Sequence, residues 1–597
     1  MPSRSFVLAL ALAAAACTTP PTNAQLRCPD GANPRAESSS ANPVSAPPAA
    51  AAKAPEGPGL DVTIRPVLDA AAIDVSLSFR GTATFPGRVF SIHTPDPKAF
   101  RMKEARDTRG TIDTRQDPRP DHVSVELARP PEGELRLTYS VETRVTPGKL
   151  PFLLSDPDRL EVTGDALLLP DAARNLRLAA KLVIDSSPYG TLESGASVSG
   201  AATSFGIGAS REVNATVDEL RGAVMLAGRM GTAVFDTIEG HDEAAWFGYT
   251  AFDPRPVSAD TAAFRTAAGE LFGERSPLPQ TFLIVPEPGP FGRFVAARRT
   301  RSVLLHVAVG EPWSGPLRIA TSVEMLRAWV GERLWIGPED PARQAEGAWF
   351  AEGVVRHLAR DMLFRFGLVT PLEVADEVNG LESILTTSPR GKEGNAALAK
   401  SFGEPGVVPL LVARGALYAL HVDAAILAKS GGQKSLQEVL RALYAKAKER
   451  RGPLPVAAWI DAMKAEIGPA EAEVFAEVIE RGGKLDLPEN ALGPCFRRET
   501  RRYERYDLGF DEVATRANIP SLLVGVRPEG PAAKAGLREG DELVEALTSA
   551  GRSDVPVTII VQRGDDRITA KYRPAGPAAS GRGWSRRKDV PDEKCTR

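Results

Sequence analysis

The hydrophobic pattern of this chain changes its period twice, and these changes divide it into three folded parts. From Leu60 to about Phe252, apolar and polar residues alternate in short runs, such as LDVTIRPVLD and HVSVELARP, between Gly, Pro and Asp residues. Alternation of this kind is typical of strands with one buried face. We therefore expect residues 60–252 to form a β-sandwich-like domain with a structural or docking role.

From about Ser258 the apolar residues recur at helical spacing, as in ADTAAFRTAAGELFGE, where Phe264 and Leu271 share one face. Two apolar strand candidates follow, at 281–285 and 302–309. Helices are then predicted around 320–333, 348–366, 371–386, 406–429, 435–450 and 455–481. A small sheet followed by helices predicts a mostly helical second domain over residues 253–490.

Short strand-like runs return near Tyr503, in YDLGFDEV, SLLVGVRP, VPVTIIVQR and RITAKYRP. They predict a second β domain over residues 491–575, and the polar residues 576–597 are expected to be a poorly ordered tail. The predicted fold class is therefore α+β with several domains, because 597 residues exceed what one hydrophobic core spans. The formal net charge of -3 gives no support for a nucleic-acid partner.

Residues 1–17 resemble a bacterial export signal. Arg4 precedes an apolar run, from Phe6 to Ala16, which is too short to span a bilayer. Cys17 stands where a lipoprotein signal places the cysteine that is acylated, although Ala14 replaces the usual leucine. We expect export to the cell envelope, as an outer-membrane lipoprotein anchored through Cys17 or as a periplasmic protein. Cleavage near Ala24, with loss of the cysteine, is the alternative.

Residues 18–59 are rich in Pro, Ala and Ser and have little to bury, so they predict a disordered tether. If the first cysteine carries lipid, three others remain in an oxidising compartment. Cys495 and Cys595 bracket the last hundred residues and can form a disulfide that joins the end of the chain to the final domain. Cys28 would then be left over in the tether, and the sequence alone does not fix the pairing.

Three segments, in this order, resemble those of one peptidase family. They are WFAEG at 349–353, ARGALYALHVDAAILAKSGGQKSLQEVLRAL at 413–443 and GVRPEGPAAKAGLREGDEL at 525–543. Over residues 60–597 the chain resembles the glycyl-aminopeptidase-like metallopeptidases of the gluzincin clan. The resemblance implies a β-rich N-terminal domain, a thermolysin-like helical domain and a C-terminal PDZ domain.

The resemblance also assigns roles to four residues. In the family, two histidines at i and i+4 of a helix and a glutamate from the next long helix bind Zn²⁺. The glutamate after the first histidine acts as general base on the zinc-bound water. Aligned on WFAEG, the histidine positions hold Val323 and Arg327 in this chain, whereas Glu324 keeps the general-base position and Glu352 that of the third ligand.

These replacements predict a chain that holds no zinc and uses no cofactor. Valine has no donor atom, and the permanent charge of Arg327 repels a divalent cation. We expect the guanidinium to pair with one of the two remaining carboxylates instead. His357 follows Glu352 by five residues, so it points away from it on a helix, and we interpret it as a buried or surface histidine rather than a ligand.

The third part of the chain resembles a PDZ domain in one loop. Leu508, Gly509 and Phe510 resemble the loop whose backbone N–H groups bind the terminal carboxylate of a peptide. Between Leu543 and the strand predicted at Val557, however, the chain is too short for the helix that forms the other wall of a PDZ groove. Peptide capture by this loop and a structural role for the domain therefore both remain open.

The function that these features favour is that of an exported, lipid-anchored pseudopeptidase whose cleft binds a peptide or a protein. Two alternatives remain. One is an active aminopeptidase whose metal is held by other residues, and the other is a structural envelope protein whose cleft is filled. Since a shared fold does not carry activity when site residues are absent, the arrangement of the site residues has to decide.

Overall fold

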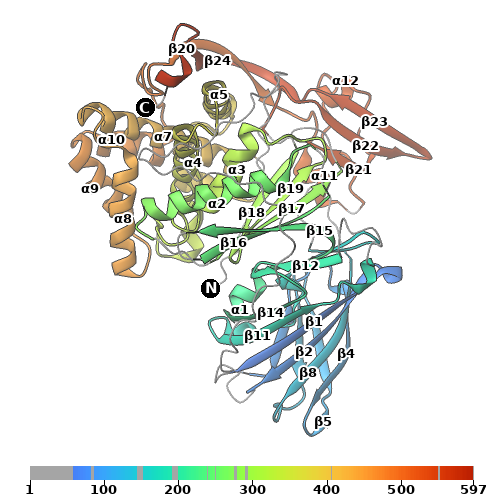
Figure 1. Ribbon diagram of the computed structural model, residues 1–597. Helices are drawn as coiled ribbons and strands as arrows, with labels where there is room; N and C mark the ends of the chain where they lie inside the picture. Colours follow the sequence, from blue (N-terminus) through green and yellow to red (C-terminus); the bar gives the residue numbers. More distant parts are fainter. Residues whose placement is uncertain are drawn as a thin grey trace, which may run out of the picture.

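The computed structural model (Figure 1) describes most of the folded chain. The described residues are 58–81, 87–143, 152–190, 199–237, 240–248, 251–274, 279–288, 293–404, 406–518, 520–548 and 551–595. The predicted signal peptide, the lipid-anchor candidate Cys17, Cys28 and nearly all of the predicted tether lie outside these residues. The fold is α+β, with an N-terminal β part, a helical part and C-terminal β sheets, which confirms the predicted class.

The N-terminal part consists of two sheets that share one core. A seven-stranded sheet has the order β14-β11-β1-β2-β8-β4-β5, and a three-stranded sheet has the order β3-β7-β6. Phe79 of the first sheet and Phe90 of the second are both buried, with ring centroids 5.5 Å apart. The strands are β1 (Gly59–Val67), β2 (Ala72–Arg80), β3 (Val89–Ile92), β4 (Phe100–Asp107), β5 (Gly110–Thr111), β6 (Thr114–Pro118), β7 (Val123–Leu127), β8 (Leu135–Glu142), β11 (Arg177–Ile184) and β14 (Ser210–Thr216).

A third, nine-stranded sheet joins the N-terminal part to the helical part. Its main order is β13-β12-β15-β16-β17-β19-β18, with β10 paired to β15 and β9 paired to β10. The strands are β9 (Leu153–Ser155), β10 (Arg159–Thr163), β12 (Ser199–Thr203), β13 (Gly206–Ile207), β15 (Val224–Thr237), β16 (Gly240–Phe247), β17 (Thr281–Glu287), β18 (Phe294–Arg299) and β19 (Ser302–Ala308). Because β16 pairs with β17, the sheet crosses the boundary expected at residue 252. Alternation along β15 and β16 shows that they are strands but not which strands they pair with.

The helices cover one face of this sheet, with α2 and α3 directly against it (Figure 1). The helical elements are α2 (Pro254–Leu271), α3 (Gly315–Leu326), the π-helical turn η8 (Trp349–Val354), α4 (Val355–Arg365), α5 (Pro371–Thr387), α6 (Asn395–Ala399), α7 (Val407–Lys429), α8 (Leu436–Arg450), α9 (Val456–Ile467), α10 (Glu471–Phe475) and η9 (Ala476–Glu480). Two predictions need correction. The helix expected over 320–333 ends at Leu326, and that over 455–481 is interrupted at Gly468, where φ is +117° and Pro469 follows.

Helix α7 is the buried centre of the helical part. It contacts α5, η8 and α9, and most of its residues are buried. In the described residues it is also the one helix that is long and apolar enough to cross a membrane, by length and composition only. Because it is enclosed by other helices, we interpret it as the core helix of a folded domain.

A two-stranded ribbon, β20 (Phe496–Tyr506) with β24 (Ala575–Arg586), lies on α5 (Figure 1). The side chain of Asn379 on α5 donates to the carbonyl of Trp584 and accepts from its N–H, at 2.8 and 2.7 Å. The structure also contains the Cys495–Cys595 disulfide. The expectation of a poorly ordered tail over 576–597 is thus wrong for residues 576–586, because pairing with β20 rather than an apolar pattern makes them a strand.

The last part is a small sheet, β21-β22-β23, with its own core. Its strands are β21 (Glu542–Leu547), β22 (Val557–Arg563) and β23 (Asp566–Tyr572), and two short helices, α11 (Glu512–Ala517) and α12 (Pro531–Lys534), accompany it. The run YDLGFDEV, which was expected to be a strand, instead ends β20 and leads through a loop into α11. The side chain of Asp511 accepts from the N–H of Ala514 and so begins that helix.

Candidate functional site

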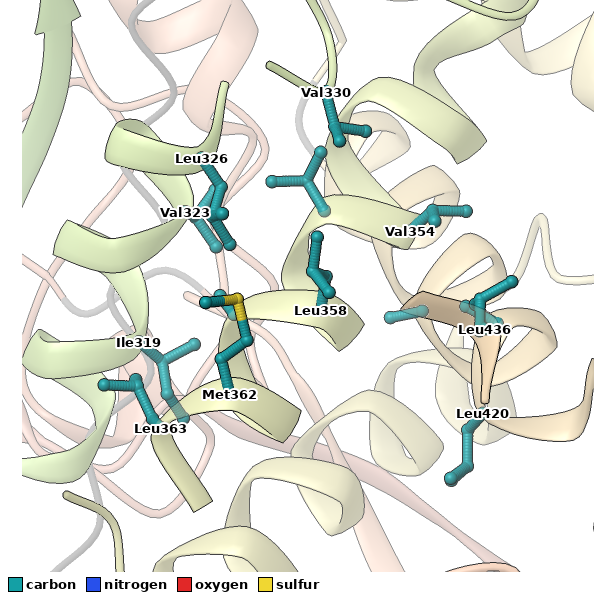
Figure 2. Packing of buried hydrophobic residues seen from close by; sticks show 14 of the residues in the cluster. Ile319, Val323, Leu326, Val330, Val354, Leu358, Met362, Leu363, Leu420 and Leu436 are labelled. Carbon is teal, nitrogen blue, oxygen red and sulfur yellow. The ribbon is translucent and has the colours of Figure 1, made fainter. Parts of the chain in front are cut away.

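Helix α3 carries the residues that the resemblance assigned to the zinc motif. It packs against β18 and α4, and its last turn ends at Arg327, which is still in the helical region with φ -56° and ψ -23°. Val323 lies one turn before Arg327 and is 6% exposed. Figure 2 shows it beside Leu326 and facing Leu358 of α4, in the hydrophobic core. Val323 therefore fills space in the core and offers no polar atom.

Glu352 is held by the π-helical turn η8, which lies against α7 at unusually short range. A Cβ on Gly353 would lie 2.6 Å from the Cα of Gly415, and one on Gly415 would lie 1.9 Å from the carbonyl oxygen of Trp349. Only two glycines permit this approach of the two backbones. The Trp349 ring is packed edge-on against Trp459 and Phe475, at 5.5 and 5.2 Å. These contacts fix the turn and direct Glu352 towards α3.

Arg327 lies between the two carboxylates. Its guanidinium donates from one Nη to Glu352 Oε2, and its Nε lies 3.2 Å from Glu324 Oε1, an ion pair that lacks hydrogen-bond geometry. The predicted pairing of Arg327 is therefore present, with both carboxylates rather than with one. The three side chains are 11–19% exposed, so solvent reaches the edge of the cluster.

One contact in the cluster was not predicted from the sequence. The other oxygen of Glu324, Oε2, accepts the backbone N–H of Arg298, at 2.8 Å. Arg298 lies on the edge strand β18, and its side chain pairs with Glu332 at 3.0 Å. A backbone donor leaves no signal in the side-chain sequence. The contact could be found only by knowing which end of β18 lies beside α3.

The cluster holds two carboxylates and one guanidinium, and burial opposes their ionisation. Burial raises the pKa of Glu352 to about 7, although Arg327 acts in the opposite direction. Burial also raises the pKa of Glu324. The two carboxylates raise the pKa of Arg327 above its usual range in spite of its burial. Arg327 therefore keeps its positive charge. Since one positive charge faces two carboxylates, it is a carboxylate that can take up a proton.

Glu352→Gln is expected to flatten the pH dependence of stability between about pH 4.5 and 7. Because the folded-state pKa of Glu352 is above the usual glutamate value of 4.5, its contribution to stability is complete below pH 4.5 and is lost as pH rises to about 7. Glutamine has no such proton. In chelator-washed protein, the urea midpoint should correspond to a loss of about 1–3 kcal/mol over this range in the parent and much less in the variant. Glu332→Gln, at an exposed carboxylate nearby, should keep the parental slope, and an unchanged slope in Glu352→Gln would disprove the assignment.

The residues at this site do not fit a zinc ion. Val323, an apolar core residue, stands at the position of the first histidine. Arg327 stands at the position of the second, and its guanidinium already pairs with both carboxylates. His357 does not supply a substitute, because its ring is buried beside Asp423 at 3.3 Å and Arg360 at 2.6 Å. Among the described residues, no group of three or more His, Cys, Asp or Glu side chains is arranged to hold a metal ion.

Three backbone polar groups of the loop Leu508-Gly509-Phe510 are hydrogen-bonded within the domain. The N–H of Gly509 donates to Asp507 Oδ1 at 2.9 Å, and its carbonyl accepts from the N–H of Arg527 at 3.0 Å. The carbonyl of Leu508 accepts from the hydroxyl of Tyr572, at 2.7 Å. Helix α11 begins two residues after Phe510, where a PDZ domain continues its groove strand. Peptide capture by this loop stays a prediction.

Comparison with known proteins adds evidence on the fold. No protein-family model matches the chain, and no curated protein matches it. Among solved structures, an aminopeptidase N family protein from Idiomarina loihiensis aligns with 90% of this chain and 99% of its own, at 16% identity and a TM-score of 0.64. The chain has the aminopeptidase N fold. At this identity the likeness concerns the fold alone.

Two further structures match less well. They are an M1 zinc metallopeptidase from Deinococcus radiodurans (16% identity, 73% of this chain and 97% of that one, TM-score 0.45) and leukotriene A4 hydrolase from Saccharomyces cerevisiae (11%, 72% and 69%, TM-score 0.43). The Idiomarina loihiensis structure agrees with the gluzincin-type fold expected from the sequence. The narrower resemblance to the glycyl-aminopeptidase-like family stays a prediction.

Proposed function

We propose that the chain is an exported, lipid-anchored pseudopeptidase of the cell envelope, a member of the glycyl-aminopeptidase-like family that binds a peptide or protein without cleaving it. The observation that carries the proposal is the ion pairing of Arg327 with Glu324 and Glu352. A guanidinium can fix two carboxylates, but it does not lower the pKa of a water molecule as a metal does. The cluster is partly open to solvent, so charged groups of a peptide can reach it.

The deciding experiment is the metal content of the purified chain after a mild chelator wash, with and without added zinc. The expected result is less than about 0.1 zinc per chain in both cases, with no hydrolysis of short peptides that begin with Gly or Ala. One tightly held zinc would overturn the proposal in favour of an active metallopeptidase with other ligands. Calorimetry with the same peptides then tests binding, which Arg327→Met should weaken. No binding of any peptide would favour a purely structural role.

The lipid anchor has its own test. Cys17→Ala is expected to move the protein from the membrane fraction to the soluble fraction of the envelope and to abolish metabolic labelling with palmitate, because the acylated thiol is removed. Cys28→Ala, in the predicted tether that follows Cys17, is the matched control and should remain labelled. Membrane attachment and labelling that persist in Cys17→Ala would contradict the assignment.

A further inference from the structure

The C-terminal domain has a groove that is separate from the peptidase cleft and from the Leu508-Gly509-Phe510 loop. It lies between α12 and the end of β23, which Figure 1 shows side by side, and its volume is about 380 Å³. The residues used below are Glu529, Pro531, Lys534, Lys571, Tyr572 and Arg573. A groove of this size can take two or three residues of an extended chain.

The groove is positively charged. Lys534 on α12 and Lys571 on β23 are both exposed, and neither makes an ion pair with a described residue. Arg573 lies at the far end, where it pairs with Glu504 at 2.8 Å. Glu529 is the one carboxylate in the described lining. The two ammonium groups, from opposite walls, outnumber the one carboxylate of the lining, which favours an acidic ligand.

One wall of the groove is the free edge of a sheet. In the described part of the chain, β23 pairs with β22 on one side and with no strand on the other. Lys571 and Tyr572, at the end of that strand, and Arg573, which follows it, line the groove. Free N–H and C=O groups at a sheet edge bind an extended peptide as an additional strand. Pro531 and the ring of Tyr572 add apolar surface for alternate side chains.

We propose that this groove binds an extended, acidic segment of a partner protein, which lies along β23 with its carboxylates between Lys534 and Lys571. The loop Leu508-Gly509-Phe510 is not part of this site. A Cβ at Gly509 would lie 2.5 Å from the backbone nitrogen of Ala532, so α12 packs directly against that loop. The groove is therefore a second place for peptide binding, and it does not depend on what the peptidase cleft binds.

The test uses the full chain and a fluorescent N-acetylated hexapeptide of alternating Glu and Val. Binding of the peptide is measured by fluorescence anisotropy. Saturable binding that weakens with salt is expected, whereas the Gln-Val and Lys-Val peptides should bind at least about tenfold more weakly. Amidated and free-acid forms of the peptide show whether the carboxylates of the side chains suffice. No saturation by the acidic peptide at millimolar concentration would overturn the proposal.

Variants locate the binding site. Lys534→Glu with Lys571→Glu is expected to weaken binding of the acidic peptide at least about tenfold. Arg567→Glu is the matched control, because Arg567 is exposed on the same strand but does not line the groove. Equal losses in both, or none in the lysine variant, would overturn the proposal. The proposal would also be overturned if the acidic peptide did not bind but anionic phospholipid vesicles did, and if that vesicle binding required the two lysines. Because zinc content does not enter these readouts, the result is independent of the pseudopeptidase proposal.

Discussion

A double variant, Val323→His with Arg327→His, is expected to bind about one zinc ion per chain, whereas the parent binds less than about 0.1. The two positions are four residues apart on α3, so their side chains leave the helix on one face. Glu352 already contacts the side chain at position 327, which places a third ligand within reach. Replacing the guanidinium also removes the charge that repels a divalent cation.

The same substitution disturbs the core, and this gives a second readout. Val323 packs among apolar side chains from α3 and α4 (Figure 2), so an imidazole at this position loses apolar contacts unless a metal draws it towards the cleft. The metal-free double variant should therefore unfold at lower temperature than the parent, and zinc should raise its midpoint by a few degrees because it binds only the folded state.

The matched control is Arg327→His alone. It offers one imidazole and the Glu352 carboxylate, and two ligands do not hold zinc through a chelator wash. Mass spectrometry of the washed proteins measures the stoichiometry. Zinc in the double variant but not in the single one would show that the two replacements are what separates this chain from a zinc protein. A folded double variant that binds no zinc would mean that Glu352 and the end of α3 do not lie where their side chains could bind one metal ion together.

The sequence predicted the type of most elements well and their partners poorly. Periodicity placed α5, α7 and α8 within a residue or two, and in the structure capping pairs such as Thr370 with Glu373 and Ser435 with Glu438 mark where α5 and α8 begin. The helix expected over 348–366 is α4 preceded by the π-helical turn η8. It did not show that β16 pairs with β17 across the expected domain boundary, since pairing is a long-range choice that alternation does not encode. For the same reason β24, which is rich in Gly, Ala and Ser, was taken for a tail.

The candidate site divides in the same way. The prediction that Val323 and Arg327 replace zinc ligands, and that the guanidinium pairs with a carboxylate, rests on the resemblance to a metallopeptidase family, aligned on WFAEG. Three features were not predicted: the π-helical turn, the contact between Gly353 and Gly415 that supports it, and the Arg298 N–H bound to Glu324. Each depends on the distance between two backbones that are far apart in sequence, and no local pattern records that distance.

Arg327→Met is expected to destabilise the helical domain by about 3–5 kcal/mol at pH 8, because it leaves Glu324 and Glu352 facing each other, mostly buried, without a cation. Burial raises the pKa values of both carboxyl groups in the folded chain, and the charge of Arg327 is the largest influence that lowers them. Without it they rise further. Such groups take up protons on folding, so the variant should regain stability as pH falls from 8 towards 4.5.

The measurement is the urea midpoint at pH 8 and at pH 5. Unfolding is monitored by the fluorescence of tryptophans such as Trp329 and Trp349, which are buried in this domain. Arg343→Met is the matched control, because Arg343 makes an i,i+3 ion pair with Glu346, as Arg327 does with Glu324, but is 59% exposed, and its loss should change the stability little at either pH. If Arg327→Met behaved like this control, the guanidinium would be a surface charge rather than the group that holds the two carboxylates together. A large loss at pH 8 that shrinks at pH 5 would show that Arg327 is the charge that holds Glu324 and Glu352 together in the folded chain.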